Sequence, residues 1–322
     1  MKRFISDRIY KLSNFSVGAM PRGVLRRILR ALHFRPDIAA RAGYQVYPDV
    51  FYNPFPSAKE VDLARLKLKR SLPGIKLDLP KAQALLAEIA SYSGEVAKLL
   101  AERPAALIRT WDDTYPPADT AVLYAMLRHL KPKRYIEVGC GYSSRTSTPA
   151  LLRNADEGVR CEALYVEPYP PAHLAEVKLP GEFLKQKIEQ VPVERFKQLQ
   201  AGDVLFIDTS HVIKTQNDVE YELLQVLPSL NAGVWVHIHD IFTPYDYPEE
   251  WLVGNGPNRG GNNEQYALEC LLSGGEDWEV VMPSFLLWKD HSESFKRLVT
   301  ADYRPASFWI RKVSAPRKEQ FS

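Results

Sequence analysis

From residue 134 onward, short apolar runs alternate with longer stretches whose apolar residues recur at helical spacing. The apolar runs are RYIEVG (134–139), CEALYVEP (161–168), DVLFID (203–208) and GVWVHIHD (233–240). Stretches such as SRTSTPALLRNA and NDVEYELLQVLPSL separate them, and EFLKQKI supplies one further short helix and strand. Unbroken apolar runs between helices are typical of a parallel sheet that is covered by helices on both faces.

Two more apolar runs follow near the end of the chain, WEVVMPSFLLW (278–288) and FWIRKV (308–313). Only a short, turn-rich segment separates them, so we expect them to pair antiparallel at one edge of the sheet. The pattern therefore predicts a Rossmann-like α/β fold, with a mainly parallel sheet and an antiparallel C-terminal hairpin.

The residues before this alternation have a different pattern. Residues 44–80 are rich in proline and irregular, and two helical patterns follow, LPKAQALLAEIASYSGEVAKLLAERP and ADTAVLYAMLRHLKP. Asp119 lies at the start of the second one, where we expect it to cap the helix. We divide the chain into a basic, partly helical extension, residues 1–104, and an α/β domain, residues 105–322.

The net charge of +3 is unevenly distributed. Residues 1–35 hold nine Lys and Arg against one acid, whereas the rest holds 42 − 9 = 33 basic and 39 − 1 = 38 acidic residues. Within PRGVLRRILRALHF one helical face is apolar, and three arginines lie off that face. Such a helix usually packs on the body of its protein or on a partner subunit in a homo-oligomer, and it can also lie on an anionic membrane.

Other features restrict the class of protein. No basic stripe with stacking aromatics recurs, so we do not expect nucleic acid as a partner. The three cysteines have no paired spacing, and no apolar run approaches the roughly 18–20 residues that a membrane span needs. The basic N-terminus lacks the apolar core of a signal peptide. We expect a cytoplasmic protein, which can also be peripheral to a membrane through residues 1–35.

A glycine-containing loop, EVGCGYSS, follows the first strand. Gly139 and Gly141 allow the backbone to turn sharply and to approach a ligand, and Glu167 at the end of the second strand can accept both hydroxyls of a ribose. The third glycine of a dinucleotide-binding loop is replaced by Ser144, and Glu137 would repel a pyrophosphate. A cationic ligand such as S-adenosylmethionine suits this loop better. The candidate cofactor-binding residues are Glu137, Gly139, Gly141, Tyr142, Ser143, Glu167 and Asp208.

Polar residues with side chains suited to catalysis or metal binding lie at the tips of the fourth and fifth strands. IDTSH brings Asp208 and His211, and HIHD brings His239 and Asp240. Since the carboxyl ends of parallel strands share one edge of the sheet, we expect these four residues near the cofactor. His239 and Asp240 can reach the same ion only if the chain turns at the strand tip, whereas His237 is expected to be structural.

The motifs EVGCGYSS, VEP, FIDTSH and HIHDI, in this order, resemble those of class I S-adenosylmethionine-dependent methyltransferases that act on macrolide sugars and rhamnosyl groups. The resemblance spans roughly residues 105–315. It implies O-methylation of a hydroxyl on a sugar or another small natural product. It also implies that Asp208 and Asp240 hold a magnesium ion and that His211 is the general base.

One residue departs from the family pattern. His239 stands where those enzymes carry a carboxylate, and magnesium prefers oxygen ligands. The metal set Asp208, His239 and Asp240 therefore leaves open magnesium, manganese, another borderline ion, or no metal. Lys214, a further catalytic candidate, can steer an anionic substrate or be a plain surface residue.

Two other functions remain open from the sequence. The fold can be a cofactor-binding module without catalysis, docked to a membrane or a biosynthetic complex through its basic arm. Alternatively, His211, His239 and Asp240 can form the facial triad of a metal-dependent oxygenase.

The long segment 242–266 contains many Gly, Asn and aromatic residues, as binding loops often do. We interpret it as a lid over a small-molecule acceptor, for which a glycoside is a good candidate. The candidate substrate-binding residues are Tyr245, Tyr247, Trp251, Asn263, Glu264 and Tyr266.

Overall fold

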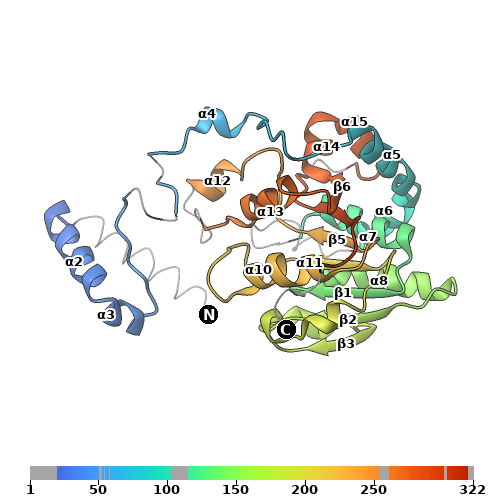
Figure 1. Ribbon diagram of the computed structural model, residues 1–322, viewed down its shortest axis with the longest axis horizontal. Helices are drawn as coiled ribbons and strands as arrows, with labels where there is room; N and C mark the ends of the chain where they lie inside the picture. The colour runs from blue at the N-terminus through green and yellow to red at the C-terminus, as the bar shows by residue number, and fades with distance from the viewer. Residues whose placement is uncertain are drawn as a thin grey trace. The chain divides into compact units, whose positions relative to one another are not determined.

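The computed structural model describes residues 20–50, 53, 55–57, 59–102, 115–253, 261–300 and 303–317 (Figure 1). The chain forms two compact units, Met1–Val61 and Asp62–Ser322. The boundary that we expected between residues 104 and 105 lies outside the described residues and stays a prediction.

The second unit is built on one seven-stranded sheet with the order β3-β2-β1-β4-β5-β7-β6. Its strands are β1 (Arg134–Val138), β2 (Glu162–Val166), β3 (Gly181–Leu184), β4 (Val204–Ile207), β5 (Trp235–Ile238), β6 (Trp278–Pro283) and β7 (Phe308–Lys312). The first five strands are parallel to one another, and β7 is antiparallel to both β5 and β6. The predicted mainly parallel sheet with an antiparallel C-terminal hairpin is confirmed.

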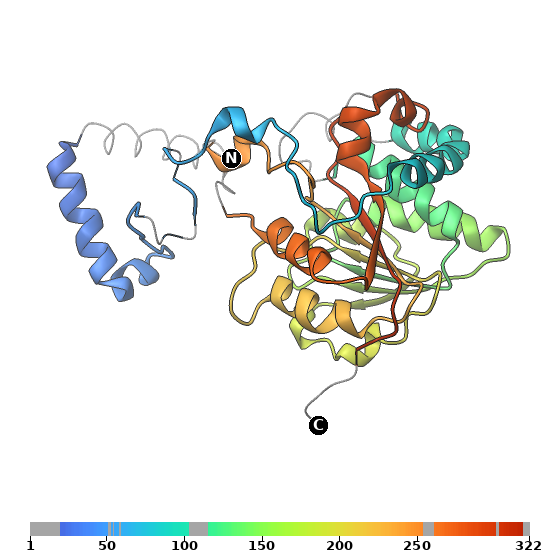
Figure 2. The same ribbon diagram turned by 45° about the horizontal axis from the view of Figure 1, so that its top comes forward.

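Helices cover both faces of the sheet, as Figure 2 shows. Successive residues of β1 point to opposite faces, so that Tyr135 belongs to one buried cluster and Ile136 to the other. Because both clusters exclude water, the residues on both faces of each strand are apolar, and the strands appear in the sequence as unbroken apolar runs. The first face carries α5 (Leu79–Ile89), α6 (Ser93–Ala101), α7 (Pro117–Leu130) and α8 (Ser144–Asp156). The second carries α10 (Asp218–Tyr221), the π-helical turn η5 (Glu222–Val226), α11 (Leu227–Ser229) and α13 (Glu264–Ser273).

Shorter helices connect these layers. They are α4 (Leu63–Leu66), η1 (Ala90–Tyr92), η3 (Ala172–Glu176), η4 (Ile188–Gln190), α9 (Val193–Phe196), α12 (Glu249–Leu252), α14 (Ser284–Asp290) and α15 (Ser292–Lys296). The first unit contains α2 (Arg22–Phe34) and α3 (Pro36–Arg41). In the described part of the chain, no helix is both long enough and apolar enough to cross a membrane.

Two local predictions were wrong. Asp119 does not cap α7, because Pro116 occupies the N-cap position and Asp119 lies inside the first turn. The carboxylate of Asp119 instead accepts hydrogen bonds from the backbone N–H groups of Ala306 and Ser307, just before β7. The run 278–288 is not one strand, since β6 ends at Pro283 and α14 begins at the next residue.

Candidate active site

The loop after β1 is shaped by a glycine that no other residue can replace. Gly139 has a φ of +84°, and a Cβ at this position would overlap the carbonyl oxygen of Asp208 at the end of β4. The bare backbone of Gly139 thus lets two neighbouring strand tips approach each other closely. A Cβ on Gly141, in contrast, would meet no protein atom within 4 Å.

Glu137 is fully buried beneath this loop. Its carboxylate accepts hydrogen bonds from Tyr135 at 2.8 Å, Ser143 at 2.8 Å, Ser144 at 2.6 Å and Ser147 at 2.6 Å. Burial raises the pKa of Glu137, and the four hydroxyl donors partly offset this rise. Glu137 therefore fastens β1 to the first turns of α8. A direct contact between Glu137 and a cofactor stays a prediction.

A cavity of about 450 Å³ opens beyond the carboxyl ends of β1, β2 and β4. Among the predicted cofactor residues, Gly139, Glu167 and Asp208 line it, and so does Lys214. The Glu167 carboxylate accepts a hydrogen bond from the backbone N–H of Tyr169 at 2.6 Å, and burial raises its pKa. This is the place where open α/β sheets bind nucleosides.

The cavity lining does not include the other predicted cofactor residues, which are Glu137, Gly141, Tyr142 and Ser143. The ring of Tyr142 stacks on His173 with 4.0 Å between ring centroids, and Ser143 donates to Glu137. Sequence reasoning missed Ile188 and Glu189, which line the cavity after β3. Both residues follow the short strand that the sequence predicted within EFLKQKI, and their position after a strand end could have indicated them.

Asp208 also belongs to a second group, a cluster of two histidines and two aspartates at the tips of β4 and β5. His211 Nε2 lies 3.2 Å from Asp208 Oδ1 and 3.2 Å from Asp240 Oδ2. His239 Nδ1 lies 3.5 Å from Asp208 Oδ1 and 3.3 Å from Asp240 Oδ1. The structure thus brings together the four residues that the sequence placed at the strand tips.

An outer carboxylate lies near the far nitrogen of each histidine. Glu264 Oε2 lies 2.9 Å from His211 Nδ1, and Asp119 Oδ2 lies 3.5 Å from His239 Nε2. Both outer carboxylates are almost completely buried. Sequence reasoning assigned Glu264 to substrate binding and Asp119 to a helix cap, and neither residue has a local signal that links it to a histidine.

The backbone of the cluster adopts unusual conformations. His211 has a φ of 58° and Asp240 a φ of 60°, which is the left-handed region that non-glycine residues seldom occupy. The backbone N–H groups of Asn263 and Glu264 hold the carbonyl oxygen of His211 at 3.0 and 3.2 Å. The turn at Asp240 brings its side chain and that of His239 to the same cluster, as a shared site requires.

The electrostatics of the cluster favour protonated histidines. Burial would lower the pKa of His211, but Asp240, Asp208 and Glu264 outweigh this effect and raise it well above the usual range. Burial is likewise outweighed at His239, where Asp208 and Asp240 raise the pKa. Burial raises the pKa of Asp240. At Asp208 burial acts in the same sense, but the two histidines outweigh it and lower the pKa.

His237 differs from the other two histidines. It is fully buried, its ring stacks on Phe206 with 4.3 Å between centroids, and Trp309 packs against its edge. Burial lowers the pKa of His237 well below the usual value, so it is neutral. These contacts agree with the structural role that the sequence predicted.

Several predicted substrate residues contribute to the protein core. Tyr245 is 6% exposed and Tyr247 is 1% exposed, both in an aromatic cluster with Phe242 and Phe285. The hydroxyl of Tyr245 donates to Asp290, and that of Tyr247 accepts from the backbone N–H of Gln265. Contact between either tyrosine and an acceptor stays a prediction.

The other predicted substrate residues lie nearer to the surface. Trp251 is half-buried beside Tyr247, and Tyr266 is 37% exposed, with Arg70 over its ring. The side chain of Asn263 accepts from the backbone N–H of Ile213, which ties α13 to the segment after His211. Residues 254–260 of the predicted lid lie outside the described residues.

The predicted metal ligands lie close together, with His239 Nδ1 3.5 Å from Asp208 Oδ1 and 3.3 Å from Asp240 Oδ1. Over the described ranges, no group of three or more His, Cys, Asp or Glu side chains is arranged to hold a metal ion. A metal at Asp208, His239 and Asp240 stays a prediction.

The sheet order, the glycine loop at the tip of β1 and the cavity beside it are those of a Rossmann-like α/β fold with a ligand cavity at the carboxyl ends of its strands. Residues 136–241 match the model of a family described as a methyltransferase domain. The protein is a methyltransferase, with S-adenosylmethionine as its cofactor. The matched segment runs from within β1 to just beyond β5 and includes Asp208, His211, His239 and Asp240.

Known proteins with similar sequences or structures are distant. An uncharacterised protein of Archaeoglobus fulgidus is 23% identical over 188 residues, which are 55% of this chain and 84% of that protein. The O-methyltransferase TomG of Streptomyces achromogenes, involved in tomaymycin synthesis, is 13% identical with a TM-score of 0.38, over 75% of this chain and 92% of TomG. A putative methyltransferase of Thermobifida fusca is 12% identical with a TM-score of 0.35, over 71% of this chain and 94% of that chain.

Proposed function

We propose that the enzyme transfers the methyl group of S-adenosylmethionine to a hydroxyl group of a small polyhydroxy acceptor, such as a sugar on a natural product. One observation carries this proposal: Asp208 lines the cofactor cavity and also contacts His211 and His239. A proton acceptor is thereby adjacent to the cavity from which the methyl group is delivered.

The chemistry of such a transfer is simple. The acceptor oxygen must lie in line with the methyl group, and it must lose its proton. His211 is the best candidate for the general base, because its Nε2 faces the centre of the cluster while Glu264 holds its Nδ1. Asp208 and Asp240 stabilise the imidazolium that forms when His211 takes the proton. Positioning of the two reactants supplies several kcal/mol more.

A divalent cation is compatible with this donor set. Asp208, His239 and Asp240 combine carboxylate and imidazole donors, which favour manganese, iron or zinc over magnesium. Asp119 would orient His239 through its far nitrogen, as outer carboxylates do in metal sites. The ion would make the acceptor hydroxyl more acidic.

The surroundings of the cluster support a polyhydroxy acceptor. Carboxylates and imidazoles can hydrogen-bond several hydroxyls at once, and Trp251 and Tyr266 are exposed enough to pack against a sugar ring. A cofactor-binding module without catalysis would have no use for two buried histidines held by four carboxylates. An oxygenase based on His211, His239 and Asp240 would leave the cavity beside Gly139 without a role.

Matched acceptors test the proposal. We expect a glycoside with the reactive hydroxyl to gain one methyl group by mass spectrometry, and its deoxy analogue to gain none under the same conditions. An N-methylated or C-methylated product, or equal methylation of the deoxy analogue, would contradict transfer to oxygen.

A metal requirement is tested separately by chelation. If Asp208, His239 and Asp240 hold a catalytic ion, we expect EDTA to abolish turnover and one divalent ion to restore it. Asp240→Asn should lose both metal and turnover, whereas Asp290→Asn, which removes a carboxylate far from the cluster in sequence, should keep both. Full activity in EDTA combined with inactive Asp240→Asn would instead assign Asp240 to holding His211 or the acceptor.

A further inference from the structure

The first unit carries a helix whose chemistry the methyl transfer does not use. α2 has apolar residues along one face, and no residue of the helix is buried. Val24, Ile28 and Leu29 on this face are 47%, 44% and 44% exposed. Large apolar side chains gathered on one exposed helical face usually mark a surface that contacts something else.

Arginines occupy the helix surface outside that apolar face. At roughly 100° per residue, Arg22 and Arg26 lie on one side of the face and Arg27 on the other, whereas Arg30 lies almost opposite to it. The helix contains no acid, and Asp37 just beyond it pairs with Arg35 at 2.8 Å. Within the described residues, none of these four arginines forms an ion pair with a carboxylate.

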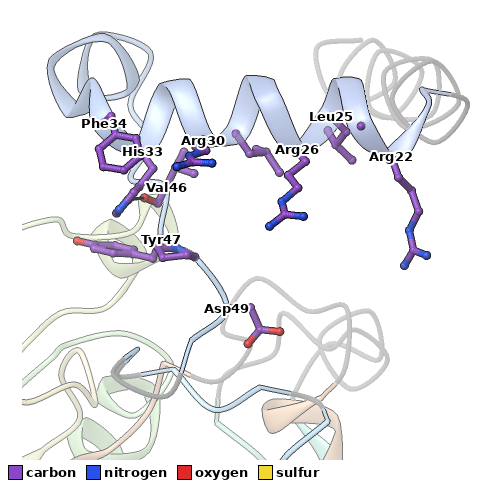
Figure 3. A pocket seen from close by; sticks show the side chains of 12 residues that line it. Arg22, Leu25, Arg26, Arg30, His33, Phe34, Val46, Tyr47 and Asp49 are labelled. Atoms are coloured by element: carbon purple, nitrogen blue, oxygen red, sulfur yellow. Dashed lines mark hydrogen bonds between the residues drawn. The ribbon is translucent and has the colours of Figure 1, made fainter.

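Three of these arginines share a hollow. It has a volume of about 1090 Å³ and lies between α2 and residues 46–49 (Figure 3). Arg22 and Arg26 extend from the helix on the side where Tyr47 and Asp49 lie. His33 Nδ1 lies 3.0 Å from the carbonyl oxygen of Val46, which ties the two walls together. The hollow therefore combines three arginines and one carboxylate, that of Asp49, with aromatic and aliphatic surface.

We propose that residues 20–50 dock the enzyme on a membrane surface that contains anionic lipids. α2 lies in the plane of the interface, its apolar face enters the acyl boundary, and Arg22, Arg26 and Arg27 beside that face bind lipid phosphates. An anionic membrane uses both properties of the helix. Nucleic acid would engage the arginines and leave Val24 and Ile28 in water, and a second copy packed on this face would bring like charges together.

Vesicle sedimentation of the full-length protein tests this inference. Wild type should bind phosphatidylcholine vesicles that contain phosphatidylglycerol, should not bind pure phosphatidylcholine, and should bind more weakly in high salt. Arg22→Glu with Arg26→Glu should weaken binding roughly 30-fold or more, since each basic residue near an anionic surface contributes about 1 kcal/mol. Ile28→Gln with Leu29→Gln should also weaken it, although the charge is unchanged.

The matched control is Lys98→Glu with Lys178→Glu, which changes the net charge equally on exposed lysines of the second unit. It should keep most of the vesicle binding. An equal loss of vesicle binding in this control would mean that net charge alone explains the loss, and it would overturn the proposal. So would binding to pure phosphatidylcholine, full competition by inorganic phosphate, or a shift with duplex DNA but not with vesicles. Because methyl transfer is assayed on soluble acceptors, failure here leaves the proposed function untouched.

Discussion

His211→Ala should lower turnover by roughly 10²–10⁴-fold, the usual effect of removing a general base. His211 Nε2 is the nitrogen that faces Asp208 and Asp240, and its Nδ1 is engaged by Glu264. Cofactor affinity should change little, because the cavity is lined by Gly139, Glu167 and their neighbours. Steady-state kinetics with saturating S-adenosylmethionine measures the loss, and titration calorimetry measures the affinity.

His129→Ala is the control for this variant. His129 lies near the C-terminal end of α7, 3.5 Å from Glu88, and it should be replaceable without loss of turnover. If His211→Ala keeps full activity, His211 is not the base, and His239 or Lys214 becomes the next candidate.

The pH profile separates a base from a merely structural histidine. His211 must be neutral to accept a proton, and the surrounding carboxylates raise its pKa well above the ordinary value near 6.5. Below this raised pKa the ring is protonated and cannot act as a base. The kcat/KM of the wild type should therefore rise with pH through a midpoint above 6.5, and the residual activity of His211→Ala should lack this limb.

Gly139→Ala should lower the free energy of unfolding by about 3 kcal/mol or more. Two costs add up, because alanine is strained in the left-handed backbone region and its Cβ has no room. The new Cβ would overlap the carbonyl oxygen of Asp208, so that the tips of β1 and β4 would have to separate. Urea unfolding followed by circular dichroism measures the change in the free energy of unfolding.

Gly141→Ala is the matched control, since its Cβ meets no protein atom within 4 Å. Its stability should stay within about 0.5 kcal/mol of wild type. Because Gly141 is expected to approach the cofactor, this variant should still bind S-adenosylmethionine less tightly. Equal stability of the two variants would contradict the close approach of the strand tips.

The sequence predicted those parts of the site that follow strands in the chain. Asp208, His211, His239 and Asp240 each stand at or just after a strand tip, and the parallel arrangement alone places strand tips together. The same logic identified Gly139 and Glu167. Local order along the chain was enough for these residues, because regular strands carry them to one edge of the sheet.

The residues that support the histidines could not be predicted in this way. Asp119 comes from α7 and Glu264 from α13, and each contacts its histidine over a separation of more than fifty residues. The left-handed backbone of His211 and Asp240 could not be assigned from residue type, because His and Asp adopt this region more often than most residues but only at a few of their positions. The composition of segment 242–266 predicted Tyr247 as part of an exposed lid. Tyr247 is buried instead, because a loop rich in aromatic residues also contains those that anchor it to the protein core.

Titration calorimetry of the wild-type protein with S-adenosylmethionine and its demethylated product tests whether the cavity at the tips of β1, β2 and β4 is the cofactor site of a methyltransferase. We expect one binding site for each compound. The affinity should fall in Glu167→Ala, because Glu167 lines the cavity. Binding of a nicotinamide nucleotide in place of both compounds would contradict a methyltransferase.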